Sequence, residues 1–188
     1  MKKFTKLHRI IHWAIAAVMS VLFITGFLRM YWMSRKTISA AVSEGLAKEN
    51  LKLPDESLRA IAKSIINPMF DWHINFAYVL VFAYLLRFVY MFVKGVKFPN
   101  PFSSSSVGKE KFQGFLYIIF YILLALQIGT GVVLMYELGS EAMMERAEEV
   151  HKFAVYWLPT FVLVHFTGIV IAETTDKKRV ASKMIGGE

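Results

Sequence analysis

The sequence of 188 residues is 56% hydrophobic, and its 22 Lys and Arg against 14 Asp and Glu give a net charge of +8. Only 19% of the residues are charged, which is low for a soluble domain, and the lack of cysteine excludes disulfides, iron–sulfur clusters and thiolate-bound haem. The positive charge lies beside apolar segments, so it indicates membrane topology and no nucleic-acid partner.

Four apolar segments are long enough to cross a bilayer, which takes about 20 residues. They are predicted at residues 10–31, 69–93, 112–136 and 153–172. We therefore predict an all-α integral membrane protein: one domain, residues 1–188, built as a bundle of four transmembrane helices.

The first segment, in "MKKFTKLHRIIHWAIAAVMSVLFITGF", has the basic head and apolar body of a signal peptide. Its apolar run is long, contains His12 and is not followed by a small-residue cleavage site. We expect it to be retained as the first span.

The connection at about 34–68 is long, and we expect "LPDESLRAIAKSIINP" within it to form a short helix that starts near Asp55 and ends before Pro68. Apolar residues recur at helical spacing on one face of it: Leu58, Ile61, Ala62, Ile65 and Ile66. Two interpretations stay open, a helix lying on the membrane surface and a docking platform for a partner.

Basic residues gather at three places that lie on one side of a four-span chain, whereas "YELGSEAMMERAEE" between the third and fourth spans is acidic. The basic residues are Lys2, Lys3, Lys6, Arg9, Lys94, Lys97, Lys109, Lys111, Lys177, Lys178, Arg179 and Lys183. The positive-inside rule then predicts that both termini are cytoplasmic and that the loop at 34–68 is on the outer side. Between the second and third spans, "PNPFSSSSVG" is expected to be a flexible linker.

Four of the five histidines fall at two predicted depths in the membrane, given a helical rise of about 1.5 Å per residue. His73 and His151 share the outer level, and His12 and His165 share the inner level. Each level has imidazoles from two different spans, as bis-histidine ligation of a haem iron requires. Ionisable residues within spans are costly and usually functional, so we predict two b-type haems, although any one histidine alone is also explained by a hydrogen bond across helices.

His151 and His165 are fourteen residues apart, and on one regular helix they would point within about 40° of each other. We expect that helix to carry one ligand for each haem. His8, one turn before His12, is expected among the lipid headgroups beside Lys6 and Arg9 and not as a ligand.

Small and cationic residues near the histidine pairs complete the candidate site. Four glycines would let a macrocycle approach a helix or would serve helix packing: Gly26, Gly129, Gly131 and Gly168. Arg87 and Arg9 would pair with haem propionates or extend to the membrane surface.

Motifs along the chain are "LHRIIHW" opening the first span, "HINFAYVLVFAYLLRFVYMFVKG" in the second, "GTGVVLMYELG" closing the third, "HKFAVYWLPTFVLVHFTGIVIAE" in the fourth, and the tail "RVASKMIGG". In these motifs the chain resembles the di-haem b-type cytochrome subunits of membrane-bound nickel–iron hydrogenases and formate dehydrogenases, within the bacterial cytochrome b561 superfamily. The resemblance covers most of the chain except residues 34–68.

The resemblance implies a multi-pass protein of the bacterial inner (cytoplasmic) membrane that works as an electron-transfer subunit. Its partners would be the iron–sulfur and catalytic subunits of a periplasm-facing hydrogenase or formate dehydrogenase, which deliver electrons to the outer haem. The inner haem would reduce menaquinone or ubiquinone. The quinone pocket would lie at "GKEKFQG", where Lys111, at a position that is asparagine in the family, and Gln113 would donate to a quinone carbonyl or would be solvated helix-start residues.

Two other functions stay open. A free-standing cytochrome b561 would exchange electrons between quinone and a small oxidant such as superoxide without a large partner. A membrane anchor without haem would only tether an enzyme.

Overall fold

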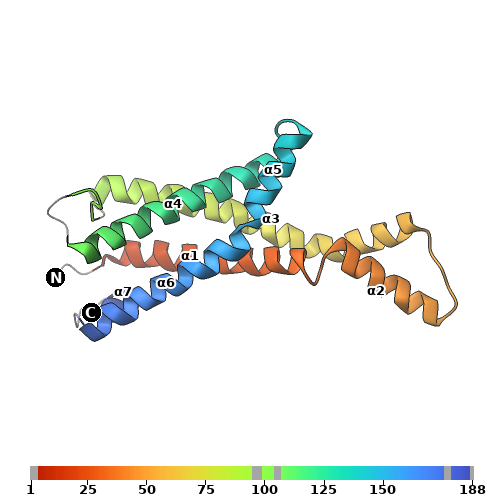
Figure 1. Cartoon of the computed structure of the whole chain (residues 1–188), viewed down its shortest axis with the longest axis horizontal. Helices are drawn as coiled ribbons and strands as arrows, with labels where there is room; N and C mark the ends of the chain where they lie inside the picture. The colour runs from red at the N-terminus through yellow and green to blue at the C-terminus, as the bar shows by residue number, and fades with distance from the viewer. Residues whose placement is uncertain (1–3, 95–98, 104–106, 176–178, 187–188) are drawn as a thin grey trace. The chain divides into compact units, whose positions relative to one another are not determined.

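The computed structural model of the chain describes residues 4–94, 99–103, 107–175 and 179–186 (Figure 1). The regular elements among these residues are all helices. They are α1 (Lys6–Met30), α2 (Arg35–Lys48), α3 (Asp55–Lys94), α4 (Gly108–Met135), α5 (Glu141–Lys152), α6 (Ala154–Thr175) and α7 (Val180–Ile185). The predicted all-α class is confirmed.

Within the described part of the chain, four helical segments are long and apolar enough to cross a membrane: α1, α3, α4 and the stretch Glu141–Thr175 formed by α5 and α6. Large apolar side chains on them remain exposed, such as Phe82 at 69%, Phe92 at 84% and Leu163 at 69%. Such surfaces are stable against lipid, and helices satisfy their backbone hydrogen bonds internally there. The four predicted spans are confirmed.

The chain divides into two compact units. The large unit comprises Met1–Ile15 and Val81–Glu188, which include the start of α1, the end of α3 and helices α4 to α7. The small unit, Ala16–Leu80, contains the rest of α1, α2 and the first part of α3. The histidines are therefore described within their own units: His73 in the small unit, the others in the large one.

The prediction that a short helix ends before Pro68 is wrong. The helix begins at Asp55, as expected, but α3 continues through Pro68, which cannot donate a backbone hydrogen bond to the carbonyl of Ser64. Leu58, Ala62 and Ile66 recur every four residues and are 8%, 0% and 4% exposed, so packing holds this part of the helix in place. The stretch from Asp55 is thus the extension of a span and not a separate helix on the membrane surface.

The predicted loop at 34–68 is itself mostly helical, because α2 forms a hairpin with the start of α3 (Figure 1). Ser34 caps α2 by accepting a hydrogen bond from the backbone N–H of Thr37. Asn50 ends the helix with a left-handed φ of 58°. The Ser39 hydroxyl then donates to the carbonyl of Leu58 at 3.4 Å, which joins α2 to α3.

The acidic connection after α4 forms α5, which Ser140 caps by accepting from the N–H of Met143. Helix α5 ends at Lys152 and α6 begins at Ala154, with a turn at Phe153 and a change of direction between them (Figure 1). His151 and His165 therefore do not lie on one regular helix. The expectation that they point within about 40° of each other assumed an unbroken helix, whereas the structure divides this segment at Phe153.

Some predicted features lie outside the described residues. These are residues 104–106 of the expected flexible linker and five of the lysines used for topology: Lys2, Lys3, Lys97, Lys177 and Lys178.

Candidate haem site

His12 of α1 and His165 of α6 lie close to each other in the large unit, with ring centres 6.2 Å apart and ring planes at 46°. An imidazole nitrogen binds a transition metal at about 2 Å, and the ring centre lies about 1 Å behind that nitrogen, so two imidazoles on opposite sides of one ion have centres about 6 Å apart. The observed separation fits that arrangement. Neither ring has a hydrogen bond to a described residue, so their nitrogens are not committed within this part of the chain.

An aromatic stack fixes the ring of His165. Phe161, one turn earlier on α6, lies nearly parallel to His165, at 5.8 Å and 10°. Phe161 in turn stacks on Phe120 of α4, with ring centres 4.4 Å apart and planes at 28°. The stack restricts the rotation of the His165 ring and links α6 to α4.

Arg87, near the end of α3, is buried at 9% exposure beside this pair. Its Nε donates to the hydroxyl of Tyr121 at 3.2 Å, one terminal nitrogen donates to Nδ1 of His8 at 3.0 Å, and its guanidinium lies 5.8 Å from the ring centre of Tyr90. A guanidinium has no acceptor, so the Nδ1 of His8 carries the lone pair and His8 is neutral. The partners of Arg87 among the described residues are thus all uncharged, and its positive charge is suited to an anion that the chain does not supply.

His8 makes several contacts with protein side chains, which sequence reasoning did not predict. Its ring stacks on Phe4 at 4.9 Å and 16° and meets the edge of Tyr90 at 5.9 Å, in addition to the contact with Arg87. The sequence contained one signal for this, since residues four apart on a helix share a face and His8 precedes His12 by four.

Arg9 is engaged with the C-terminal helix. One of its terminal nitrogens donates to the carbonyl of Ile185 at 3.0 Å, and Trp13 Nε1 donates to the carbonyl of Met184 at 3.3 Å, so α1 holds α7. The Nε of Arg9 is buried and has no hydrogen-bond partner among the described residues. That nitrogen is a buried donor for which an anion would supply the acceptor.

In the small unit, His73 of α3 lies against α1. Its Nδ1 is 2.8 Å from Oγ1 of Thr25, and the same hydroxyl is 2.8 Å from the carbonyl of Val21. A threonine hydroxyl has one proton and a carbonyl has none, so the hydroxyl donates to Val21 and accepts from Nδ1–H of His73. This assignment places the ring's lone pair on Nε2, the atom that a metal would bind. A Cβ at Gly26 would come 3.8 Å from Cε1 of His73, which shows how closely the helix approaches the ring.

In the large unit, His151 repeats this arrangement against α4. Its Nδ1 is 3.1 Å from Oγ1 of Thr130, which donates to the carbonyl of Leu126 at 2.8 Å. Nδ1 of His151 is therefore also the donor, and its lone pair is on Nε2. A Cβ at Gly131 would come 3.2 Å from Cε1 of His151, and Gln127 donates to the His151 carbonyl at 2.8 Å.

A threonine followed by a glycine thus supports each of these histidines, in "ITGF" and in "GTGV". Sequence reasoning identified both glycines but missed both threonines. The Thr-Gly pair was a weak signal, because it occurs in three spans and the third, Thr167-Gly168, supports no histidine. The other two candidate glycines, Gly129 and Gly168, have no described heavy atom within 4 Å of an added Cβ.

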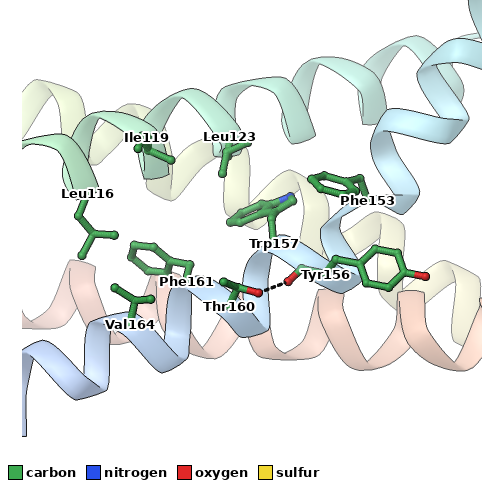
Figure 2. Close-up of a pocket in the computed structure, with 9 residues that line it drawn as sticks. All are labelled: Leu116, Ile119, Leu123, Phe153, Tyr156, Trp157, Thr160, Phe161 and Val164. Atoms are coloured by element: carbon green, nitrogen blue, oxygen red, sulfur yellow. Dashed lines mark hydrogen bonds between the residues drawn. The ribbon is translucent and has the colours of Figure 1, made fainter.

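The candidate quinone-binding residues lie in the first turns of α4. Gln113 is exposed and Lys111 is partly exposed, and neither side chain hydrogen-bonds to a described residue. About one turn further along, α4 and α6 border an apolar groove of about 310 Å³ (Figure 2). Its walls include Leu116, Ile119 and Leu123 of α4 with Phe153, Trp157 and Phe161. Phe161 therefore lines the groove and stacks on His165.

Among the described residues, no three or more His, Asp or Glu side chains gather in a group that would hold a metal ion. The histidines instead fit a metal that takes two protein ligands and its remaining ligands from a macrocycle, as haem iron does. The described residues therefore suit haem in ligand type, ring spacing and tautomer.

Comparison with known families agrees with this donor set. A family model described as prokaryotic cytochrome b561 matches residues 3–187, nearly the whole chain. No curated protein and no solved structure matches the chain. The match confirms the cytochrome b561 superfamily indicated by the motifs, and it leaves the hydrogenase or formate dehydrogenase assignment open. The chain belongs to the prokaryotic cytochrome b561 family, multi-pass membrane proteins that bind b-type haem and transfer electrons.

Proposed function

We propose that the chain is the di-haem cytochrome b subunit of a complex in the bacterial inner membrane, which carries electrons from a periplasmic dehydrogenase to membrane quinone. The observation that carries the proposal is the pair His12 and His165, whose ring centres are 6.2 Å apart, in a family that binds haem b. When bound, each haem supplies a one-electron redox centre. The name of the matching family model refers to nickel hydrogenases. It therefore supports an electron donor of the hydrogenase or formate dehydrogenase type, with its iron–sulfur subunit.

The inner haem is assigned to His12 and His165. The stack of Phe120 and Phe161 holds the plane of the His165 ring. Arg87 is assigned to a haem propionate, because it is buried and its described partners are neutral. Arg9 is assigned to the same kind of contact through its unpartnered Nε.

The outer haem is assigned to His73 and His151. Thr25 and Thr130 keep the two rings in the tautomer whose Nε2 binds iron, and they increase the basicity of the ligands by accepting from Nδ1–H. Gly26 and Gly131 leave the rings room beside the neighbouring helix.

Quinone, menaquinone or ubiquinone, is assigned to the cytoplasmic end of α4, with its head group at Lys111 and Gln113. The apolar groove that begins at Leu116 is suited to its isoprenoid tail. With both termini cytoplasmic, electrons cross inward and quinone takes its protons from the cytoplasm. Each charge moved against the membrane potential stores about 2.3 kcal/mol per 100 mV.

A free-standing cytochrome b561 is the second candidate, because the family description fits it as well. It would use the same haems and quinone with a small oxidant, and it would purify without iron–sulfur or catalytic subunits. The opposed histidines disfavour an anchor without haem, since such a subunit has no use for two imidazoles facing each other.

The function is tested by mixing the dithionite-reduced protein with a quinone analogue and following haem re-oxidation by stopped-flow absorbance. His12→Ala should remove the inner haem and abolish rapid re-oxidation of the remaining haem, because that haem lies away from the quinone site. The matched variant His73→Ala should lose the outer haem and keep rapid re-oxidation of the inner one. If His12→Ala reacts at the wild-type rate, quinone meets the outer haem, and the free-standing cytochrome is the better account.

Replacement of Thr130 by valine should raise the midpoint potential of one haem by about 40 mV. The reason is that a lost hydrogen bond of about 1 kcal/mol no longer favours the ferric iron through its ligand. A redox titration measures the midpoint potential, and an unchanged haem spectrum verifies that the haem is still bound. Thr130→Ser should restore the wild-type potential. Thr167→Val is the control, because the Thr167 hydroxyl donates only to the carbonyl of Leu163. Equal potentials in the wild type and Thr130→Val would show that the threonine does not tune the ligand.

Filling the groove by Leu123→Trp should raise the KM for a long-tailed quinone about threefold. The effect is modest because lipid is as apolar as the groove, so that only packing contacts are lost. The rate with a tail-less quinone should not change, and neither should either rate in Leu126→Trp, where the exposed Leu126 lies outside the groove. If the KM rises equally for both quinones, the isoprenoid tail does not bind in this groove.

A further inference from the structure

A small cavity of about 70 Å³ in the small unit combines positive charge with one apolar wall. Three helices meet around it: the end of α1, the start of α2 and the first part of α3. Its lining residues are Arg29, Arg35, Lys63, Ile66, Asn67 and Phe70. Phe70 stacks on the candidate ligand His73, with ring centres 6.2 Å apart, and the other five residues take no part in the histidine sites or the quinone site.

The charge of the cavity is not balanced within the described chain. Arg29, Arg35 and Lys63 are cations, and none of the cavity's lining residues is acidic. No described carboxylate forms an ion pair with them, including Asp71, which lies one turn after Asn67 on the same helix. Three like charges around one small space repel one another, and an anion between them removes that repulsion.

Exposed aromatic residues show where this region meets the membrane surface. Trp32 is 70% exposed just after α1, and Trp72 on α3 is 60% exposed, with Tyr31 and Phe70 beside them at 42% and 45%. Tryptophan and tyrosine concentrate at the level of the lipid headgroups, where their rings are partly apolar and partly hydrated. Phe70 both belongs to this group and lines the cavity, so the cavity lies at headgroup depth.

We propose that this cavity binds the phosphate group of an anionic phospholipid headgroup. The two guanidinium groups supply paired donors that match phosphate oxygens, Lys63 adds a third positive charge, and the Asn67 side chain adds an amide donor. Ile66 and Phe70 form the apolar wall on the side of the acyl chains. Inorganic phosphate carries the same group, so the test must distinguish free phosphate from the phospholipid. The proposal is independent of the electron-transfer function.

The test compares two triple variants of the full-length, haem-loaded protein, delipidated in a neutral detergent. Arg29→Gln/Arg35→Gln/Lys63→Gln removes the lining charges, and Lys36→Gln/Lys52→Gln/Arg59→Gln removes the same charge from exposed residues outside the cavity. Native mass spectrometry measures the dissociation constants of a short-chain phosphatidylglycerol, of a diacylglycerol with the same chains and of inorganic phosphate. An unchanged haem spectrum verifies the fold of each variant.

We expect the first triple variant to bind phosphatidylglycerol about a hundredfold more weakly, about fivefold for each cation removed, and the second to bind it like the wild type. Diacylglycerol should bind the three proteins equally. Tight binding of phosphatidylglycerol but not of inorganic phosphate identifies a lipid site, and equal binding of both identifies a site for free phosphate.

The proposal is overturned if both triple variants bind phosphatidylglycerol and phosphate as the wild type does. It is also overturned if the two triple variants lose phosphatidylglycerol binding equally. Should the first triple variant not fold, Lys63→Gln against Arg59→Gln gives the same comparison, with a fivefold loss expected for the former only.

Discussion

An imidazole inside a bilayer has two ring nitrogens that must each find a partner, and this constraint organises the candidate site. For His73 and His151 the protein commits Nδ1 to a threonine whose own proton is already used by its helix. Only Nε2 can then bind a metal. For His12 and His165 the described residues supply no hydrogen bond, so the ring nitrogens of this pair, 6.2 Å apart between ring centres, are left for a ligand that the chain does not supply.

Burial of charge is the second constraint, and it acts on the arginines. A guanidinium surrounded by neutral groups is stable in a low-dielectric interior only if an anion joins it. Arg87 is in this position beside the His12 pair, and a haem propionate is the anion that the proposed function provides. The cluster of Arg29, Arg35 and Lys63 is not buried, and its problem is the repulsion between three like charges around one cavity, which the phosphate of a phospholipid would relieve. Phe70 connects that cavity to the candidate ligand His73, since their rings are parallel at 6.2 Å.

The four spans could be predicted from the sequence because the thickness of the bilayer sets the length of an apolar helix. The meeting of His12 and His165 could also be predicted, since helical rise converts sequence position into depth. Pro68 misled the prediction because a proline does not always end a helix. Buried Leu58, Ala62 and Ile66 hold the residues before it in place, so α3 continues through it. The turn at Phe153 was not predicted, since no local residue signals it strongly. The threonine partners and the contact between His8 and Arg87 depend on which helices become neighbours, and that information is tertiary.

The central claim is that four histidines hold two haems, each iron between two imidazoles. Electron paramagnetic resonance of the oxidised protein, combined with the ratio of haem to protein, tests it most directly. The account predicts two haems per chain, both giving low-spin ferric signals and neither giving a high-spin signal. One haem per chain, or a high-spin signal from an iron that lacks a second imidazole, would contradict it.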